Sequence, residues 1–155
     1  MAEKTLYWED LTLGKTWTAR QSAPITTQQI IAFAVEYDPL DMHIDPDLAR
    51  TSPLGVHCAS GIQTFAISQR LMCDALLLQT HVVAGGKIDG VWMVAPVVAG
   101  DRLELSTQVV RALPHARNPE RGWTVFKVEV VTAEGKIVLV YEVTILVLRS
   151  DEHRH

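Results

Sequence analysis

The residues of this chain best suited to acid–base chemistry are an aspartate and a histidine five positions apart, Asp38 and His43. Both belong to a polar stretch, residues 37–46, within an otherwise apolar region. Pro39 disfavours helical backbone at Asp38, so we expect the pair in a loop where the two side chains can converge. A carboxylate and an imidazole that hold one water between them form an acid–base device, because each can titrate near neutral pH when partly buried. The spacing therefore predicts a catalytic pair.

A second candidate lies at the junction of residues 57–61, where Ser60 and Gly61 open a helix. The first turn of a helix presents unpaired N–H groups and a partial positive charge. Gly61 has no side chain to block close approach, so its N–H is predicted to polarise a thioester carbonyl as an oxyanion donor. Ser60 is predicted either to cap this helix or to donate a hydrogen bond to the same carbonyl.

Each of these residues also has a purely structural explanation. Asp38 could simply end a helix, and His43 could be a buried histidine bonded to a backbone carbonyl. Ser60 lacks the G-x-S-x-G elbow of a hydrolase nucleophile, and Cys58 is expected to be a small buried group. Three acidic neighbours and a second histidine are residue types that bind metal ions: Asp41, Asp45, Asp47 and His57. Their spacing matches no known metal site, so we expect no bound metal.

The elements that must position these residues fall into a helical half and a strand half. A helix is predicted from Thr26 or Thr27 to Tyr37, and residues 38–57 are predicted to be irregular with one turn capped by Asp45. A second helix is predicted from Ser60-Gly61 to about Leu78. It is apolar on most of its circumference, so we expect it to be covered on several sides.

Strands are predicted from the Val-, Ile-, Leu- and Thr-rich segments of the chain, at residues 16–20, 81–84, 86–94, 102–112, 122–132 and 136–148. Turns are expected at Gly85-Gly86, Gly100-Asp101 and Glu134-Gly135. Helices followed by a run of antiparallel strands indicate an α+β domain. One long helix wrapped by a curved sheet of five or six strands, the hot-dog arrangement, is the simplest solution.

Composition limits the class of protein and of partner. The 155 residues are 48% hydrophobic and 21% charged, as in a soluble globular protein, and we expect a single domain over 1–155 with a lead-in, 1–24, and a polar tail, 150–155. The net charge is −4 and basic residues are scattered, which argues against nucleic acid as a partner. The polar N-terminus and the charges within the second helix argue against a signal peptide and a membrane span, so we expect a cytoplasmic protein.

The stretch from Phe33 to Gly61, FAVEYDPLDMHIDPDLARTSPLGVHCASG, resembles the signature of the MaoC-like dehydratases. An aromatic-ended helix leads to Asp, then to His five positions on, then to Asp-Pro and Ala, and finally to a small-residue pair at the start of the hot-dog helix. The resemblance extends through residues 95–97 and Gly100-Asp101 to the closing strands, and so covers nearly the whole chain.

This resemblance implies an (R)-specific enoyl-CoA hydratase that converts trans-2-enoyl-CoA to (R)-3-hydroxyacyl-CoA, or the reverse. It implies that Asp38 and His43 activate the water and that the Gly61 N–H holds the enolate oxygen. The implied protein needs no metal or redox cofactor beyond the coenzyme A of its substrate, and is a homodimer or larger homo-oligomer.

The chain departs from the family pattern at three places. Leu40-Asp41 replaces the Asn-Pro of many members, Ser60-Gly61 replaces a His-Gly pair, and no Arg occurs within residues 91–94. Two alternatives therefore stay open: a hot-dog acyl-CoA thioesterase, which would release free thiol, and a non-catalytic MaoC-like subunit, which would bind acyl chains without hydrating them.

Overall fold

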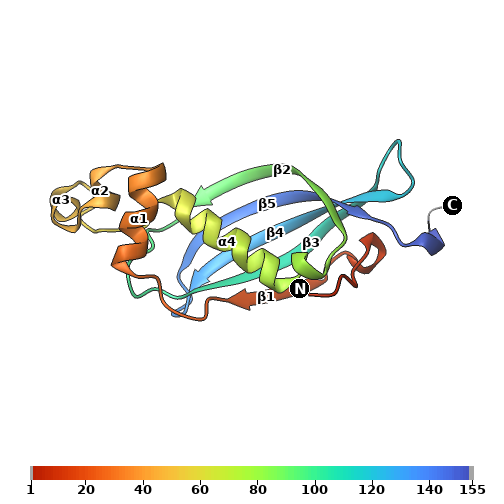
Figure 1. Cartoon of the computed structure of the whole chain (residues 1–155), viewed down its shortest axis with the longest axis horizontal. Coiled ribbons are helices and arrows are strands. Elements are labelled where there is room, and N and C mark those ends of the chain that lie inside the picture. The colour runs from red at the N-terminus through yellow and green to blue at the C-terminus, as the bar shows by residue number, and fades with distance from the viewer. Residues whose placement is uncertain (1, 154–155) are drawn as a thin grey trace.

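Five antiparallel strands form one sheet in the computed structural model, which describes residues 2–153. Their order across the sheet is β1-β3-β4-β5-β2, so β1 and β2 are the edges (Figure 1). The strands are β1 (Thr16–Arg20), β2 (Val82–Met93), β3 (Leu103–Pro114), β4 (Arg121–Thr132) and β5 (Ile137–Leu148). The α+β class predicted from the sequence is confirmed.

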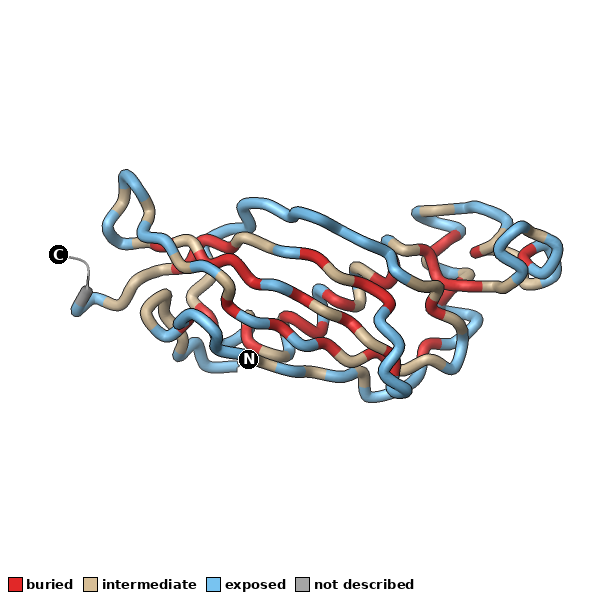
Figure 2. The backbone as a smooth tube through the Cα atoms, turned by 180° about the vertical axis from the view of Figure 1, so that it is seen from behind, coloured by how far each residue is buried: buried red, intermediate tan, exposed pale blue. Residues whose placement is uncertain are grey.

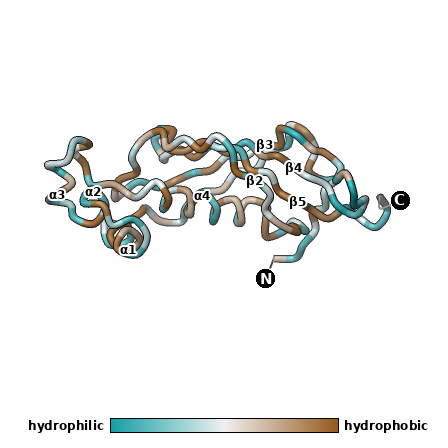
Figure 3. The backbone as a smooth tube through the Cα atoms, turned by 90° about the horizontal axis from the view of Figure 1, so that it is seen from above, coloured by the Kyte–Doolittle hydropathy of each residue, from teal (hydrophilic) through white to brown (hydrophobic). Residues whose placement is uncertain are grey.

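The long helix α4 (Gly61–Ala75) lies along one face of this sheet, and the shorter helices α1, α2 and α3 gather at one end (Figures 1 and 3). The core lies between α4 and the three central strands, where Leu71 and Met72 share one cluster with Phe126 and Leu105. Burial of such side chains contributes about 1.5–3 kcal/mol each, so this interface is the main source of stability. The hot-dog arrangement expected from the sequence is present.

Helix α4 is shorter and less covered than the sequence predicts. It ends at Ala75, because Leu76 leaves the helical region with φ −156° and a 3-10 turn follows over Leu77–Gln79. The prediction that α4 is covered on several sides is also wrong for the single chain, because Ile62 is 54% exposed while Ser68 is fully buried. The sheet covers only one face of the helix, so some apolar side chains of α4 remain exposed to solvent in the single chain.

Strand β2 runs without interruption through Gly85-Gly86, where the sequence predicts a turn. Its pairing with β5 instead contains three register shifts, one of them between Gly85 and Lys87. A bulge absorbs an extra residue by bending the strand, which explains why the glycines do not end it. Nearly the whole of β2 is exposed, in contrast to the buried positions of the central strands (Figure 2).

The short helices begin at the capping residues that the sequence indicates. Thr26 precedes α1 (Thr27–Tyr37) and accepts a hydrogen bond from the Gln29 N–H, whose side chain in turn accepts from the Thr26 N–H. Asp45 caps α3 (Pro46–Thr51), and α2 (Asp41–Ile44) lies between. Residues 38–57 therefore hold two short helices rather than the single turn that we predicted.

The two ends of the chain are joined by an ion pair. Glu9, in the 3-10 turn Trp8–Asp10, accepts hydrogen bonds from the Arg149 guanidinium at 2.8 Å and from the Ser150 N–H at 3.1 Å. Burial opposes the charge on Glu9, but these donors outweigh it and lower the pKa of the carboxyl. A 3-10 turn, Asp151–His153, follows, and residues 1, 154 and 155 of the predicted lead-in and tail lie outside the described residues.

Among the described residues, none of the helices combines the length and apolar character required to cross a membrane.

Candidate active site

Asp38 and His43 lie together at the end of the molecule where the helices gather. Asp38 ends α1 in a non-helical conformation, and His43 lies in α2 with only 6% of its surface exposed. Their nearest atoms, Asp38 Oδ2 and His43 Nε2, are 3.6 Å apart. This separation is too long for a direct hydrogen bond but leaves both atoms facing one shared position.

The hydrogen bond on the other side of the imidazole fixes its tautomer. His43 Nδ1 lies 2.7 Å from the backbone oxygen of Cys58, and a carbonyl oxygen can only accept. Nδ1 therefore carries the proton in the neutral ring, and Nε2 presents its lone pair toward Asp38. Two acceptors thus point at the same place, where a water could donate to both.

Ser60 joins this pair through the carboxylate. Its hydroxyl donates to Asp38 Oδ2 at 2.6 Å and accepts from the Ile62 N–H at 3.2 Å, and the residue is completely buried. The sequence indicates the capping role, but not the bond to Asp38, because the two residues are 22 positions apart. Ser60 therefore couples the start of α4 directly to the Asp38–His43 pair.

A cavity of about 380 Å³ opens beside His43 and Gly61. Thr64, one turn into α4, adds a buried hydroxyl to its wall, whereas much of the remaining wall is apolar. The apolar residues include Met42, Leu54, Met93, Pro96, Val97 and Val138. A mainly apolar cavity with few polar groups suits an acyl chain attached to one reacting group.

Gly61 allows a close contact at the mouth of this cavity. A Cβ at this position would overlap the thioether of Met93, which lies directly against the glycine. The Gly61 N–H is in the first turn of α4, where N–H groups have no acceptor within the helix. Neither Met93 nor Thr64 was singled out by the sequence, since their elements carry no motif there.

The segment before Ser60 holds His43 from two directions. The His57 ring donates from Nε2 to the His43 backbone oxygen at 2.8 Å, while Cys58 accepts from the His43 ring. Cys58 is buried as predicted, and burial raises the pKa of its thiol, which keeps it protonated at neutral pH. His57 thus supports the site through the His43 backbone, whereas in the sequence it was considered only as a metal ligand, a role we did not expect.

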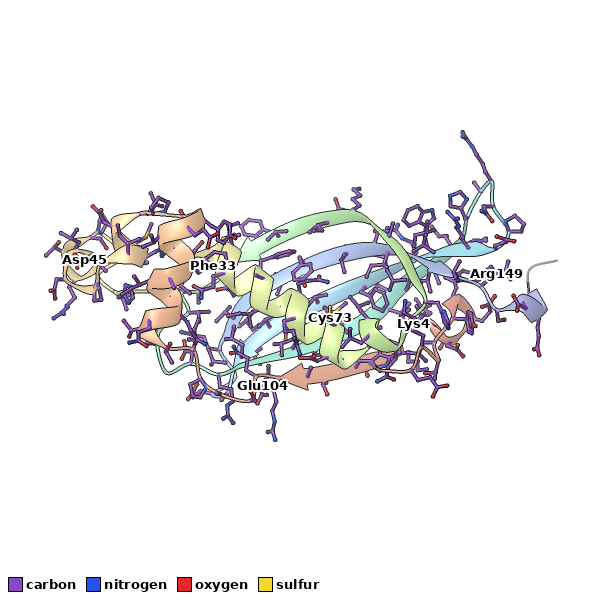
Figure 4. The ribbon with its side chains drawn as sticks, in the orientation of Figure 1. Lys4, Phe33, Asp45, Cys73, Glu104 and Arg149 are labelled. Atoms are coloured by element: carbon purple, nitrogen blue, oxygen red, sulfur yellow. The ribbon has the colours of Figure 1, made fainter. Side chains whose placement is uncertain are left out.

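Two of the acidic neighbours, Asp45 and Asp47, are engaged elsewhere. Asp45 accepts from the Asp47 and Leu48 N–H groups and lies at the far end of the helical region (Figure 4). Asp47 pairs with Arg50 at 2.6 Å. Within residues 2–153, His, Cys, Asp and Glu side chains do not gather in threes as metal ligands would. Cys58 and Cys73 are both free thiols.

A profile of the MaoC like domain family matches residues 10–130, which include all of the site except the wall contributed by Val138. The chain belongs to the MaoC-like domain family. The family resemblance seen in the sequence is therefore confirmed. The match covers α1 to α4, strands β1 to β3 and nearly all of β4, and ends before β5.

Comparison with individual proteins agrees with this family assignment. The chain is similar to a MaoC-like dehydratase of Rhodospirillum rubrum, with a TM-score of 0.87, 28% identity, and coverage of 94% of this chain and 99% of that one. It is 29% identical over 140 residues to the uncharacterized protein YdeM of Bacillus subtilis, covering 90% and 96% of the two chains. The (R)-hydratase PhaJ1 of Pseudomonas aeruginosa shares the fold, with a TM-score of 0.71, 20% identity and coverage of 96% and 89%.

Proposed function

We propose that this protein catalyses the reversible hydration of a trans-2-enoyl-CoA to the (R)-3-hydroxyacyl-CoA. The observation that supports the proposal is the pair of acceptors, Asp38 Oδ2 and His43 Nε2, set 3.6 Å apart, with His43 lining a largely apolar cavity at the start of α4. Membership of the MaoC-like family supports the same reaction class.

In the proposed reaction, Asp38 and His43 take a proton from the water between them while its oxygen adds to C3 of the enoyl thioester. The electron pair of the double bond moves toward the carbonyl oxygen, where the Gly61 N–H stabilises the enolate. The same pair then delivers a proton to C2. The addition of water changes no overall oxidation state, so this reaction requires no redox cofactor. We propose that coenzyme A enters only as part of the substrate.

We also propose that the protein acts in the cytoplasm as a homodimer or larger homo-oligomer. The oligomer is supported by the apolar edge strand β2, where Ile88, Val91 and Trp92 are exposed in the single chain. An exposed apolar edge favours pairing with a second copy, and a twofold axis would place the two β2 strands antiparallel. Sedimentation velocity of the protein tests this, and a monomer at micromolar concentration would contradict it.

The activity is tested by mixing the protein with crotonyl-CoA or a longer trans-2-enoyl-CoA and following enoyl absorbance beside thiol release. A hydratase lowers the absorbance without releasing thiol, whereas thiol release indicates a thioesterase and no change indicates a binding subunit. Asp38→Asn and His43→Ala should each slow hydration by about two or more orders of magnitude. Asp41→Asn, an exposed neighbour on α2, is the matched control. Unchanged rates in the Asp38 and His43 variants would overturn the proposal.

A further inference from the structure

Strand β2 leaves one long edge of the sheet open. Just before the strand this edge is covered by the chain itself, since the His81 N–H donates to the Leu6 oxygen at 2.9 Å and Leu6 bridges to Thr80. Over Val82–Met93 the strand pairs with β5 alone, so no other strand of the described residues lies along its outer edge (Figure 1). Ile88 lies near the middle of this open stretch. A twofold pairing that uses the whole stretch in two copies is therefore centred near Ile88.

The side chains around Ile88 are distributed over both faces of the sheet. Ile88 pairs with Val143, which packs against the core, so Ile88 points to the α4 side. Lys87 and Asp89, directly before and after it, point to the opposite, outer face, because successive side chains of a strand alternate. Their charged groups, Lys87 Nζ and Asp89 Oδ2, lie 3.1 Å apart on that face. The outer face of the open edge thus carries one cation and one anion, placed symmetrically about Ile88.

Ala84 and Trp92 extend this symmetry. Each is four positions from Ile88, and both point to the outer face, because their partners on β5, Leu146 and Val140, are an odd number of positions from the partner of Ile88. A regular strand would place residues four apart on the same face, but a register shift on either side of Ile88 reverses the face. The faces therefore follow the same order in both directions from Ile88, as a twofold pairing requires.

We propose that two copies of this chain pair antiparallel along β2 in a single register, with Ile88 opposite Ile88 of the second copy. In this register Lys87 of each copy faces Asp89 of the other, so opposite charges meet twice across the axis. Trp92, which is 69% exposed, faces Ala84 of the second copy, whose small side chain leaves room for the indole. Centring the pairing on Lys87 or Asp89 would instead oppose like charges, and a half-step shift would set side chains of opposite faces against each other. This inference rests on the proposed homodimer and not on the hydratase reaction.

Disulfide trapping tests the register. Residues directly opposite each other in antiparallel strands have Cα atoms about 4.5–5.5 Å apart, within the reach of a disulfide. Ile88→Cys should therefore form a disulfide-linked dimer on mild oxidation. Lys87→Cys and Asp89→Cys should not link to themselves, but should link to each other once the two proteins have exchanged subunits. The wild type, with its free thiols Cys58 and Cys73, gives the background. No link in Ile88→Cys, or equal self-linking of Lys87→Cys, would overturn the register.

Charge reversal tests the contacts, with the dimer Kd measured by sedimentation. Lys87→Asp opposes two carboxylates at both contacts and should raise the Kd by about tenfold or more. Lys87→Asp/Asp89→Lys restores opposite charges and should return the Kd to within about threefold of the wild type. Arg50→Asp is the matched control, because it breaks the exposed pair with Asp47 on α3, away from β2. A double variant as weak as Lys87→Asp, or an equal effect of Arg50→Asp, would show that these charges do not meet across the axis.

Assembly, register and chemistry fail separately in these measurements. A wild type that sediments as a monomer overturns both the proposed dimer and this pairing. A dimer in which Ile88→Cys does not cross-link overturns the register alone. Neither measurement needs substrate or turnover, so a cross-linked dimer without hydration activity overturns the hydratase proposal and leaves the pairing standing.

Discussion

Replacing Ser60 by alanine should reduce both stability and turnover, because one hydroxyl serves both the helix and the acid–base pair. Loss of the helix cap costs about 1 kcal/mol. Loss of the 2.6 Å hydrogen bond to Asp38 costs a further 1.5 kcal/mol or so, near the lower end for a charged acceptor because that carboxylate is partly exposed and water can replace the hydroxyl. We therefore expect Ser60→Ala to lower the free energy of unfolding by ~2–3 kcal/mol.

The effect on turnover follows from geometry rather than from stability. Without Ser60 the Asp38 side chain is free to rotate, and a displacement of about 1 Å in a catalytic group can reduce kcat by ~10- to 100-fold. KM should change little, because the acyl cavity and the Gly61 N–H stay in place. Urea unfolding and the enoyl absorbance assay measure the two effects separately.

Asp45→Ala provides the matched control, since the Asp45 carboxylate caps α3 and its hydrogen bonds go to the start of that helix rather than to Asp38 or His43. Its loss should cost about 1 kcal/mol in stability and leave kcat unchanged. A Ser60→Ala protein with wild-type kcat, or an Asp45→Ala protein with equally reduced kcat, would show that Ser60 does not position Asp38.

Three further perturbations test other parts of the structure. His57→Leu should lower kcat by about tenfold with little change in KM, and His57→Gln, whose amide can still donate, should recover most of it; equal activities would contradict a positioning role. Gly61→Ala should lower the melting temperature and activity through its clash with the methionine thioether, and adding Met93→Ala should restore stability, as a double-mutant cycle would show. Because the pKa of Glu9 is lowered in the folded protein, its pairing with Arg149 should stabilise the protein above the carboxyl's unfolded pKa of about 4.3 and progressively less below it. Urea unfolding across pH should therefore show Glu9→Gln less stable at neutral pH and close to wild type in acid; a pH-independent difference would contradict this.

The features predicted most closely from the sequence depend on one residue and its immediate neighbours. The helix starts at Thr26, Asp45 and Ser60 follow from side-chain oxygens that accept from N–H groups two or three positions on. The convergence of Asp38 and His43 was also predictable, because only a short segment separates them and the resemblance to the MaoC-like signature included both.

What could not be predicted depends on which distant surfaces meet. No local rule pairs Ser60 with Asp38 or places Met93 on Gly61, since the first contact joins the end of α1 to the start of α4 and the second arises only when the sheet has docked on α4. The wrong boundary at Gly85-Gly86 has the same origin: pairing with β5 compensates for the low strand propensity of glycine and absorbs the irregularity as a bulge.

The residues that we propose to be catalytic come from one region of the chain, whereas the cavity wall is shared between that region and the strands. His43, Gly61 and Thr64 lie between residues 38 and 64, as do Met42 and Leu54 of the wall, whereas Met93, Pro96, Val97 and Val138 belong to the strands or follow β2. The two regions are joined at the base of the cavity by the hydrogen bond from Ala59 N–H to the Val97 oxygen at 2.8 Å. Under the proposed function, substitutions at the strand residues of this wall should alter which acyl groups fit, while leaving Asp38, His43 and Ser60 in place.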